Sequence, residues 1–227
     1  MKIKVYQIDR EHDDKNVMFM GYDFTMSHGG IDPSDYKCVF DGNVECSDLE
    51  EVFTLCNEDH PIGYNGHSLS VSDIVDVEQD GCYFCDRVGF KKLDDFDASS
   101  VEPIEGKRML VIEPHKAPYE MVIPDKLEVL QQAVRGMIEA TYPFEDNAFI
   151  FSNEEAKLIG MEGNRRLNGE IYAGPMLIVG DDGVGGTMDL TDEQIVKIHE
   201  DVRAAGGHLT RRSGIFCGIR YIRLLLI

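Results

Sequence analysis

Apolar and polar positions in the first hundred residues follow patterns that predict several strands and one short helix. Residues 3–8, 71–77 and 82–90 are each typical of a strand. The dipeptide Asp80-Gly81 between the last two suits the positive φ angles of a tight hairpin. Ser47-Asp48-Leu49-Glu50 is a capping box, and the apolar residues behind it recur at helical spacing, namely Leu49, Val52, Phe53 and Cys56. We therefore expect an amphipathic helix there and antiparallel sheet at the end of this segment.

The second hundred residues predict a similar mixture of strands and helices. Apolar runs at 109–112 and 119–123 predict strand, turn, strand, because Pro114 and Pro118 interrupt them. Further strands are expected at 148–151 and 171–179. A helix capped by Asp125 is expected to bury the stripe Leu127, Leu130, Val134, Met137 and Ile138. A last helix is expected to start at the cap formed by Thr191 with Gln194 and to bury Ile195, Ile198 and Val202.

A small, polar segment closed by Pro103 divides these two halves. We predict a first domain over residues 1–97, a linker over 98–107, a second domain over 108–205 and a basic, apolar tail over 206–227. A length of 227 residues suits one large or two small domains. The predicted fold class is α+β, with two small mixed domains, each an antiparallel or mixed sheet with one or two packed helices.

The charge of the chain is strongly acidic and unevenly distributed. Asp and Glu total 42 against 22 Lys and Arg, which gives a net charge of −20. Residues 202–227 carry five arginines and no Asp or Glu. A negative surface repels polyphosphate, so direct binding of nucleic acid is disfavoured. Such a surface can instead bind a basic groove, including one that normally holds DNA or RNA, although solubility alone also explains it.

The sequence also indicates the cellular compartment and the oxidation state of the cysteines. No apolar run approaches the roughly 18–20 residues of a membrane span, and no apolar signal region follows Met1. We therefore expect a cytoplasmic protein without a membrane partner, whose six cysteines are reduced. Its oligomeric state is left open.

Cys82-Tyr83-Phe84-Cys85 is the sharpest local motif, since two thiolates three residues apart can bind zinc or form a redox pair. A structural zinc site needs two more ligands, and no second pair has the required spacing. In a strand, residues three apart also face opposite sides. Buried, unreactive thiols are therefore the favoured interpretation, with zinc or redox chemistry as alternatives.

Other metal and phosphate motifs are incomplete as well. The stretch 76–81 imitates the first half of a calcium loop, but Arg87 stands where the closing glutamate is required. The glycine-rich stretch 180–186 lacks a lysine, and its two aspartates repel phosphate. We predict no metal, no cofactor and no catalytic residue.

Two groups of charged residues are candidates for contact with a partner. Asn164, Arg165 and Arg166 form a dense basic site within an acidic region, and arginine forks recognise carboxylates or phosphates. Internal pairing of these arginines is the alternative. An acidic interaction face is expected from carboxylates of the first domain, namely Asp73, Asp76, Glu78, Asp80, Asp94 and Asp95.

The first domain resembles a known family in several blocks of sequence. They are 35–42, 49–53, His60-Pro61, the S-L-S-V-S-D block at 68–73 and 83–90, which contains C-D-x-x-G-F. Together they resemble the YodL-like domain over about residues 1–97. That domain occurs in proteins of phages and conjugative elements of Firmicutes. Only Cys85 of the cysteine pair belongs to its motif, which further disfavours a paired thiol site.

Residues 107–202 resemble a second, uncharacterised domain from the same kinds of mobile element. The matching blocks are 111–114, the expected helix 127–138, 163–167, 173–180 and 190–194. Residues 208–227 match neither pattern. The resemblance implies delivery by a mobile element into bacterial cytoplasm, and it implies no reaction.

Charge and context together favour an interaction protein over an enzyme. The leading hypothesis is a non-enzymatic accessory or anti-defence protein that binds and inhibits a host nuclease or another nucleic-acid-handling protein, partly by DNA mimicry. A second hypothesis is an enzyme or sensor for a small anionic ligand held by Arg165 and Arg166. A third is a scaffold or regulatory module.

Overall fold

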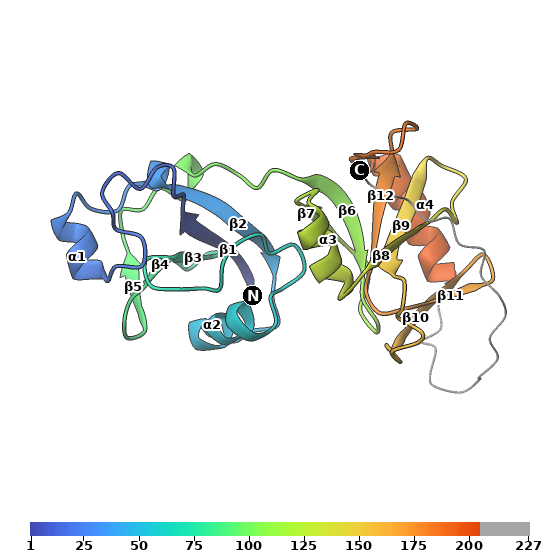
Figure 1. Cartoon of the computed structure of the whole chain (residues 1–227), viewed down its shortest axis with the longest axis horizontal. Helices are drawn as coiled ribbons and strands as arrows, with labels where there is room; N and C mark the ends of the chain where they lie inside the picture. Colours follow the sequence, from blue (N-terminus) through green and yellow to red (C-terminus); the bar gives the residue numbers. More distant parts are fainter. Residues whose placement is uncertain (205–227) are drawn as a thin grey trace.

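Two antiparallel sheets, each packed against helices, form the framework of the protein (Figure 1). The structure is a computed structural model and describes residues 1–204. The predicted basic tail 206–227 therefore lies outside the described residues. The two sheets with their helices confirm the predicted α+β class of two small mixed domains.

The first domain is built on a sheet with strand order β2-β1-β3-β4-β5. All of its ladders are antiparallel. Its elements are β1 (Lys2–Ile8), α1 (Tyr22–Ser27), η1 (Pro33–Asp35), β2 (Tyr36–Asn43), α2 (Leu49–Glu58), β3 (Ile74–Val77), β4 (Gly81–Cys85), β5 (Phe90–Leu93) and η2 (Ala98–Ser100).

The second domain is built on a sheet with strand order β7-β6-β12-β9-β8, to which β13 adds by pairing with β12. Strands β10 and β11 form a separate hairpin. The elements are β6 (Lys107–Ile112), β7 (Tyr119–Ile123), α3 (Leu127–Val134), β8 (Ile138–Thr141), β9 (Ala148–Asn153), β10 (Gly163–Leu167), β11 (Glu170–Ala173), β12 (Met176–Asp181), β13 (Thr187–Met188) and α4 (Asp192–Ala204).

Helix α2 begins where the sequence predicts, but its cap lies one residue further along. The Asp48 side chain accepts a hydrogen bond from Glu51 N at 2.9 Å, and the Glu51 carboxylate accepts from Ser47 N at 2.7 Å. Asp48 is therefore the N-cap residue rather than Ser47, and the Glu51 carboxylate reaches back to the N–H of Ser47, one residue before the N-cap. The cap of α4 is the predicted one, since Thr191 and Gln194 exchange hydrogen bonds of 2.9 and 3.2 Å.

Helix α3 differs from the prediction at both ends. Lys126 is its N-terminal flanking residue, and Asp125 instead accepts a hydrogen bond from the Thr187 hydroxyl. The helix ends at Val134 because Arg135 takes a left-handed conformation with φ 62°. Met137 is therefore 58% exposed rather than part of a buried stripe, and Ile138 begins strand β8.

Two of the predicted long strands are each divided by a turn. Residues 82–90 contain β4 and the start of β5, separated by the turn in which Asp86 N donates to Gly89 O. Residues 171–179 contain β11 and β12, separated at Gly174, whose φ is 70°. The hairpin between β3 and β4 has positive φ at Gln79 and Gly81, so Asp80 is not one of the positive-φ residues that we predicted.

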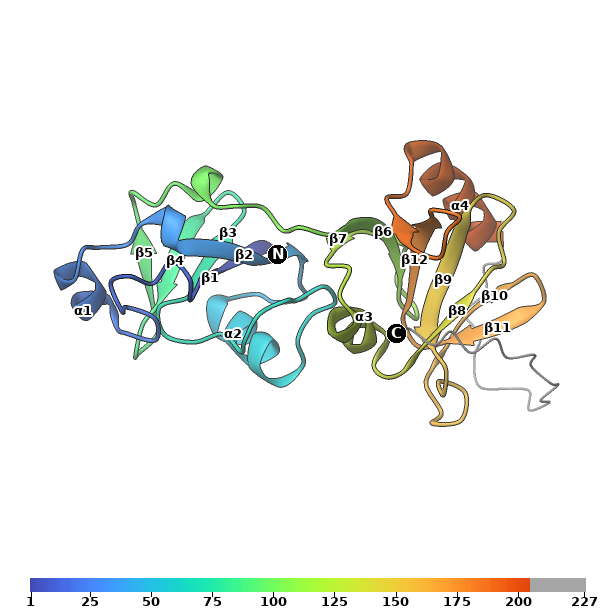
Figure 2. The ribbon, with the colours of Figure 1, turned by 45° about the horizontal axis from the view of Figure 1, so that its top comes forward.

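Helices cover the two faces of the second sheet (Figure 2). Val129, Val134 and their neighbours on α3 pack with Met109 and Val111 on one face. Ile195, Ile198 and Val202 of α4 pack on the other face with Leu110 and Ile112, which confirms the predicted buried stripe of α4. Consecutive residues of β6 thus point to opposite cores, as the alternation of a strand requires.

One hydrophobic core continues from the first domain into the second. Ile3, Val39 and Val52 of the first domain belong to the same cluster as Ile123 and Leu130 of the second. The junction is tight, because a Cβ atom added at Gly63 would lie 2.9 Å from the terminal methyl carbon of Met121. The two domains are therefore packed together and are not merely tethered by the segment between η2 and β6.

None of the helices in residues 1–204 is both long and apolar enough to cross a lipid bilayer.

Candidate functional site

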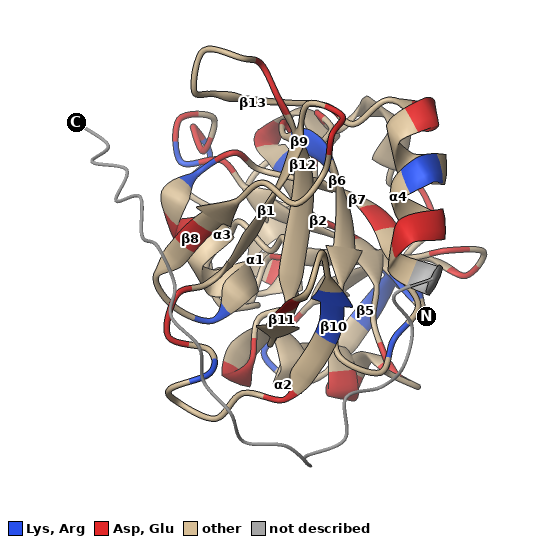
Figure 3. Cartoon of the chain, turned by 90° about the vertical axis from the view of Figure 1, so that its right-hand side faces the viewer, with Lys and Arg blue, Asp and Glu red and all other residues tan. Residues whose placement is uncertain are grey.

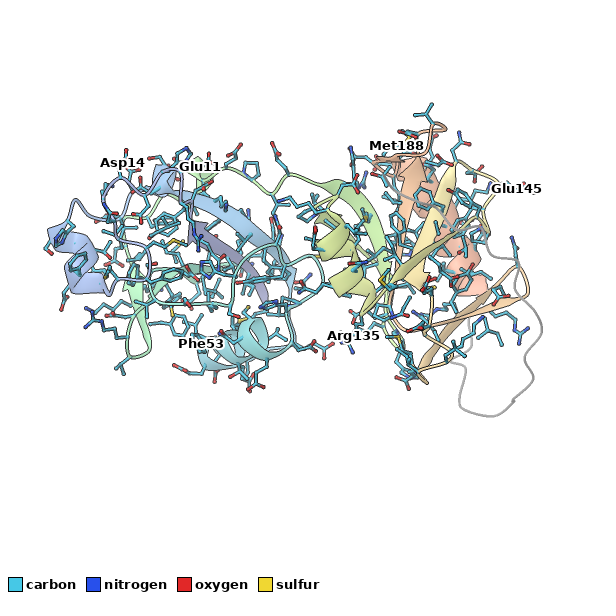
Figure 4. The ribbon with its side chains drawn as sticks, in the orientation of Figure 1. Glu11, Asp14, Phe53, Arg135, Glu145 and Met188 are labelled. Carbon is cyan, nitrogen blue, oxygen red and sulfur yellow. The ribbon has the colours of Figure 1, made fainter. Side chains whose placement is uncertain are left out.

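A cleft of about 1070 Å³ lies where the two domains meet. One wall comes from residues 40–62, which include the end of β2, the following loop and helix α2. The other wall comes from the β6–β7 turn, strand β7 and the end of α3. Figure 4 labels Phe53 on helix α2 and Arg135 at the end of α3, and Arg135 belongs to the lining. The cleft thus has one wall on each domain.

Carboxylates dominate the rim of this cleft. Seven acidic residues line it against two basic ones, Lys116 and Arg135; the acids are Glu45, Asp48, Glu50, Glu51, Glu58, Asp59 and Glu113. Helix α2 presents several of them because its buried face, with Val52 and Cys56, turns the intervening positions outward. A cleft with this lining favours cations over anions.

Both basic residues of the cleft already form ion pairs that cross the domain junction. Lys116 Nζ lies 3.1 Å from Glu45 Oε1 and 3.2 Å from Glu113 Oε1. Burial opposes the charge of Lys116, but hydrogen bonds to these two carboxylates raise its pKa. Arg135 Nη2 lies 3.5 Å from Asp59 Oδ2. Carboxylates such as Glu50 and Glu58 have no ion-pair partner among residues 1–204 and remain open to one.

The floor of the cleft is apolar and aromatic. Phe40, Leu55, Ile62, Tyr119 and Met121 line it beneath the acidic rim. Tyr119 also donates a hydrogen bond of 3.0 Å to Glu113 Oε1, and burial together with this carboxylate raises its pKa. Carboxylates around an apolar floor suit a basic chain whose aliphatic stems pack below its charged ends.

The predicted contact site Asn164, Arg165 and Arg166 lies on strand β10, which is partly blue in Figure 3 because of its two arginines. Asn164 is fully buried, and its Nδ2 donates to Ile112 O at 2.8 Å and to Gly174 O at 2.7 Å. It therefore cannot contact a partner, which corrects our prediction. Arg165 is 8% exposed. Arg166 is exposed and lines a smaller hollow of about 410 Å³ with Glu145, Asp146, Lys197 and Asp201 among other residues.

The predicted acidic interaction face is also changed by burial. Asp73 is only 1% exposed and therefore does not belong to a surface. Asp76 is partly buried and accepts a hydrogen bond of 3.3 Å from the Tyr6 hydroxyl. The other four carboxylates are exposed, namely Glu78, Asp80, Asp94 and Asp95. Glu78 and Asp80 form ion pairs with Lys2 and Lys92 at 3.6 and 3.1 Å.

Asp73 instead belongs to a buried polar cluster with Gln7, Tyr64 and His67. Gln7 Nε2 lies 3.0 Å from Asp73 Oδ2 and 2.8 Å from the His67 carbonyl oxygen, and Gln7 Oε1 accepts from His67 N at 3.0 Å. Burial raises the pKa of Asp73 to about 8, although Ser70 N and Gln7 donate hydrogen bonds to its carboxyl. These bonds fix the loop before β3 to strand β1, and we assign the cluster to stability.

The thiols considered for metal binding are buried, and the loop considered for phosphate binding forms a closed turn. Cys82 and Cys85 are both buried, and burial raises the pKa of each thiol to about 12. Both are free cysteines. In the stretch 180–186 the Asp182 carboxylate accepts hydrogen bonds from Val184 N and Gly186 N, which closes the turn on itself. No group of three or more potential metal ligands occurs within residues 1–204.

Comparison with protein families divides the chain at the same place as the fold. Residues 2–96 match the YodL-like domain, and residues 107–203 match a domain of unknown function, DUF3846. The chain joins a YodL-like domain to a DUF3846 domain. This confirms the predicted resemblance of both halves. Searches of the curated proteins and of the solved structures found no match.

The acid-lined cleft is the feature that sequence reasoning missed. One wall belongs to the YodL-like domain and the other to the DUF3846 domain, so no local motif contains it. A partial signal was present, because Glu45, Asp48, Glu50 and Glu51 crowd the start of the predicted helix. Only the packing of the two domains brings Glu113 and the apolar floor to the same place.

Proposed function

We propose that this protein is a non-enzymatic binding protein that holds a basic segment of a partner protein in the acid-lined cleft. The observation that carries the proposal is the lining of the cleft by seven carboxylates, against two cations that are already paired within the chain. Such a lining attracts lysine and arginine at long range and fixes their position at short range. The apolar floor adds contact for the aliphatic parts of these side chains.

The partner class that we propose is a host nuclease or another nucleic-acid-handling protein of the bacterial cytoplasm. Proteins of this class carry basic grooves for phosphate, and the net charge of −20 is complementary to such a groove. A basic segment of such a groove that is held in the cleft is not free to bind nucleic acid, which makes the protein an inhibitor and in part a mimic of DNA. The family resemblance to domains of phages and conjugative elements supports an accessory or anti-defence role.

Two charge-matched double variants test the cleft. Glu50→Gln with Glu58→Gln removes two exposed cleft carboxylates that have no ion-pair partner among the described residues. Asp94→Asn with Asp95→Asn removes two exposed carboxylates outside the cleft and changes the net charge equally. Wild type and both variants are immobilised and exposed to a bacterial lysate, and the retained proteins are quantified by mass spectrometry.

We expect a basic protein that wild type and the Asp94/Asp95 variant retain, and that the Glu50/Glu58 variant loses. Equal retention of basic proteins by the two variants would mean that the position of the removed charges does not matter, and it would refute the cleft. If the Asp94/Asp95 variant alone lost the partner, the site would be the acidic face of the YodL-like domain. A retained partner that carries no basic groove would favour the scaffold or regulatory alternative.

A further inference from the structure

Arg165 is a buried cation without a carboxylate partner. It lies on β10 in the DUF3846 domain and is 8% exposed. Among residues 1–204 it forms no ion pair, although the chain has 42 acidic residues. The undescribed residues 205–227 contain no Asp or Glu, so no side-chain carboxylate of theirs supplies the missing charge. Buried charges are normally paired, and this one therefore requires an explanation.

The Arg165 guanidinium donates hydrogen bonds to neutral oxygen atoms only, and some of its N–H groups have no acceptor within residues 1–204. Arg165 Nη1 donates to Asn164 O at 3.0 Å and to Asn164 Oδ1 at 3.2 Å, and Nη2 donates to Lys116 O at 2.9 Å. A guanidinium has five N–H donors. The Nε–H and one Nη2–H of Arg165 have no acceptor among the described residues. Arg165 Nε is also not among the buried polar atoms without a partner, so it reaches the surface.

These bonds hold the guanidinium in place and leave the Nε–H and one Nη2–H free to donate to a ligand. Asn164 is itself fixed by hydrogen bonds to Ile112 O and Gly174 O, so the support of Arg165 is anchored to two further segments. Burial lowers the pKa of Arg165, in the direction expected for a buried cation without a carboxylate partner. A bound anion restores the missing counter-charge. The site is thus organised before any ligand arrives, which reduces the entropy cost of binding.

We propose that Arg165 forms a binding site for a small monovalent carboxylate, which accepts hydrogen bonds from its Nε–H and Nη2–H. Nε and Nη2 form the fork of a guanidinium that matches the two oxygens of a carboxylate. A divalent phosphate suits the site less well, because the net charge of −20 opposes a second negative charge. The proposal is independent of the cleft and of any basic partner.

The neighbouring Arg166 is a natural control for this site. It has the same charge and lies on the same strand, but it is exposed, and its Nη1 makes a single weak contact of 3.4 Å with Gly169 O. An exposed guanidinium is hydrated and mobile, and its pairing with an anion in water contributes little. A carboxylate therefore prefers Arg165, even though Arg166 is the more accessible of the two.

Nuclear magnetic resonance of the ¹⁵N-labelled full chain tests the site directly. The Nε–Hε signal of Arg165 is assigned from its loss in Arg165→Lys and is followed during titration with sodium acetate. Sodium chloride at the same ionic strength and sodium phosphate serve as parallel titrations. We expect a saturable shift of the Arg165 signal with acetate and a dissociation constant on the order of millimolar. With chloride we expect no saturation, and with phosphate weaker binding.

Two variants check that the effect belongs to Arg165. Arg165→Gln is expected to abolish the saturable response of the surrounding amide signals, whereas Arg166→Gln is expected to keep it. If Arg165→Gln does not fold, the wild-type titration still decides, since it reports on the Arg165 Nε–Hε itself. An Arg165 signal that does not move, that moves equally with chloride, or that saturates more tightly with phosphate would overturn the proposal of a carboxylate site.

Discussion

Protonation of Asp73 is linked to the stability of the fold. Its carboxyl is 1% exposed, and burial raises its pKa to about 8, whereas an unfolded aspartate has a pKa of about 3.9. Because the folded-state pKa is the higher one, the fold favours the protonated form. The contribution of Asp73 to stability is therefore fully present below pH 4 and is lost as the pH rises through about 8.

The Asp73→Asn variant removes this titration while keeping the shape of the side chain. Between pH 5 and 8 we expect wild type to lose up to ~4 kcal/mol of unfolding free energy more than the variant, at 1.36 kcal/mol per pH unit. Urea unfolding of both proteins at the two pH values measures the difference. A variant that loses as much stability as wild type would show that Asp73 stays ionised in the fold.

At the same scale, the burial of single residues limited what the sequence could predict. Arg165 and Asp73 are charged, and charged residues are rarely buried, so a surface role was the natural expectation for both. The sequence gives no strand signal at β10, because Gly163-Asn164-Arg165-Arg166-Leu167 has no alternation of apolar and polar residues. The sequence identified the arginine pair as a candidate site, but without a strand prediction it did not reveal that Arg165 is buried and Arg166 exposed.

At the scale of elements, the positions of α2 and α4 were predictable, whereas neither the cap nor the end of α3 was. Asp48 and Thr191 cap α2 and α4 through hydrogen bonds that their local sequence encodes. The end of α3 depends on a left-handed residue, Arg135, which helical periodicity does not reveal. The turn at Gly174 was not predicted, because residues 171–179 form a continuous apolar run and such a run does not indicate where a strand ends.

Strand β7 and the loop after α2 form one of the contacts between the two domains. Gly63 has φ +87°, and a Cβ there would lie 2.9 Å from the Met121 methyl carbon. Gly89 has φ +67°, and a Cβ there would have no neighbour within 4 Å. We expect Gly89→Ala to cost about 1 kcal/mol, from backbone strain alone. Gly63→Ala should cost about 1 kcal/mol more, the low end for overpacking, because the Met121 methyl group is the flexible end of a side chain and must shift.

Thermal unfolding of both glycine variants measures this difference. Gly63→Ala is expected to have the lower melting temperature of the two. Equal melting temperatures would show that Met121 moves aside freely, and the packing of β7 against the YodL-like domain would then be looser than the structure indicates.

At the scale of the whole molecule, one shared core and one charged cleft are the main features. The hydrophobic cluster runs through both domains, so the walls of the cleft are fixed relative to each other. Preformed walls favour binding, because little conformational freedom is lost on association. The composition gave the net charge directly. That acidic residues gather at the domain junction could not be predicted, because it depends on the packing of residues 40–62 against 113–135.

The central claim is that carboxylates of the cleft attract and hold a basic partner, and association kinetics test it most directly. A fluorescein-labelled peptide rich in lysine and arginine is mixed with wild type and with the Glu50→Gln, Glu58→Gln variant in a stopped-flow experiment. Between 0.1 M and 1 M salt the Debye length falls from ~10 Å to ~3 Å. We predict that the association rate of wild type falls at least tenfold over this range, and that the variant starts slower and falls less. Rates that do not change with salt, or that are equal in the two proteins, would contradict the claim.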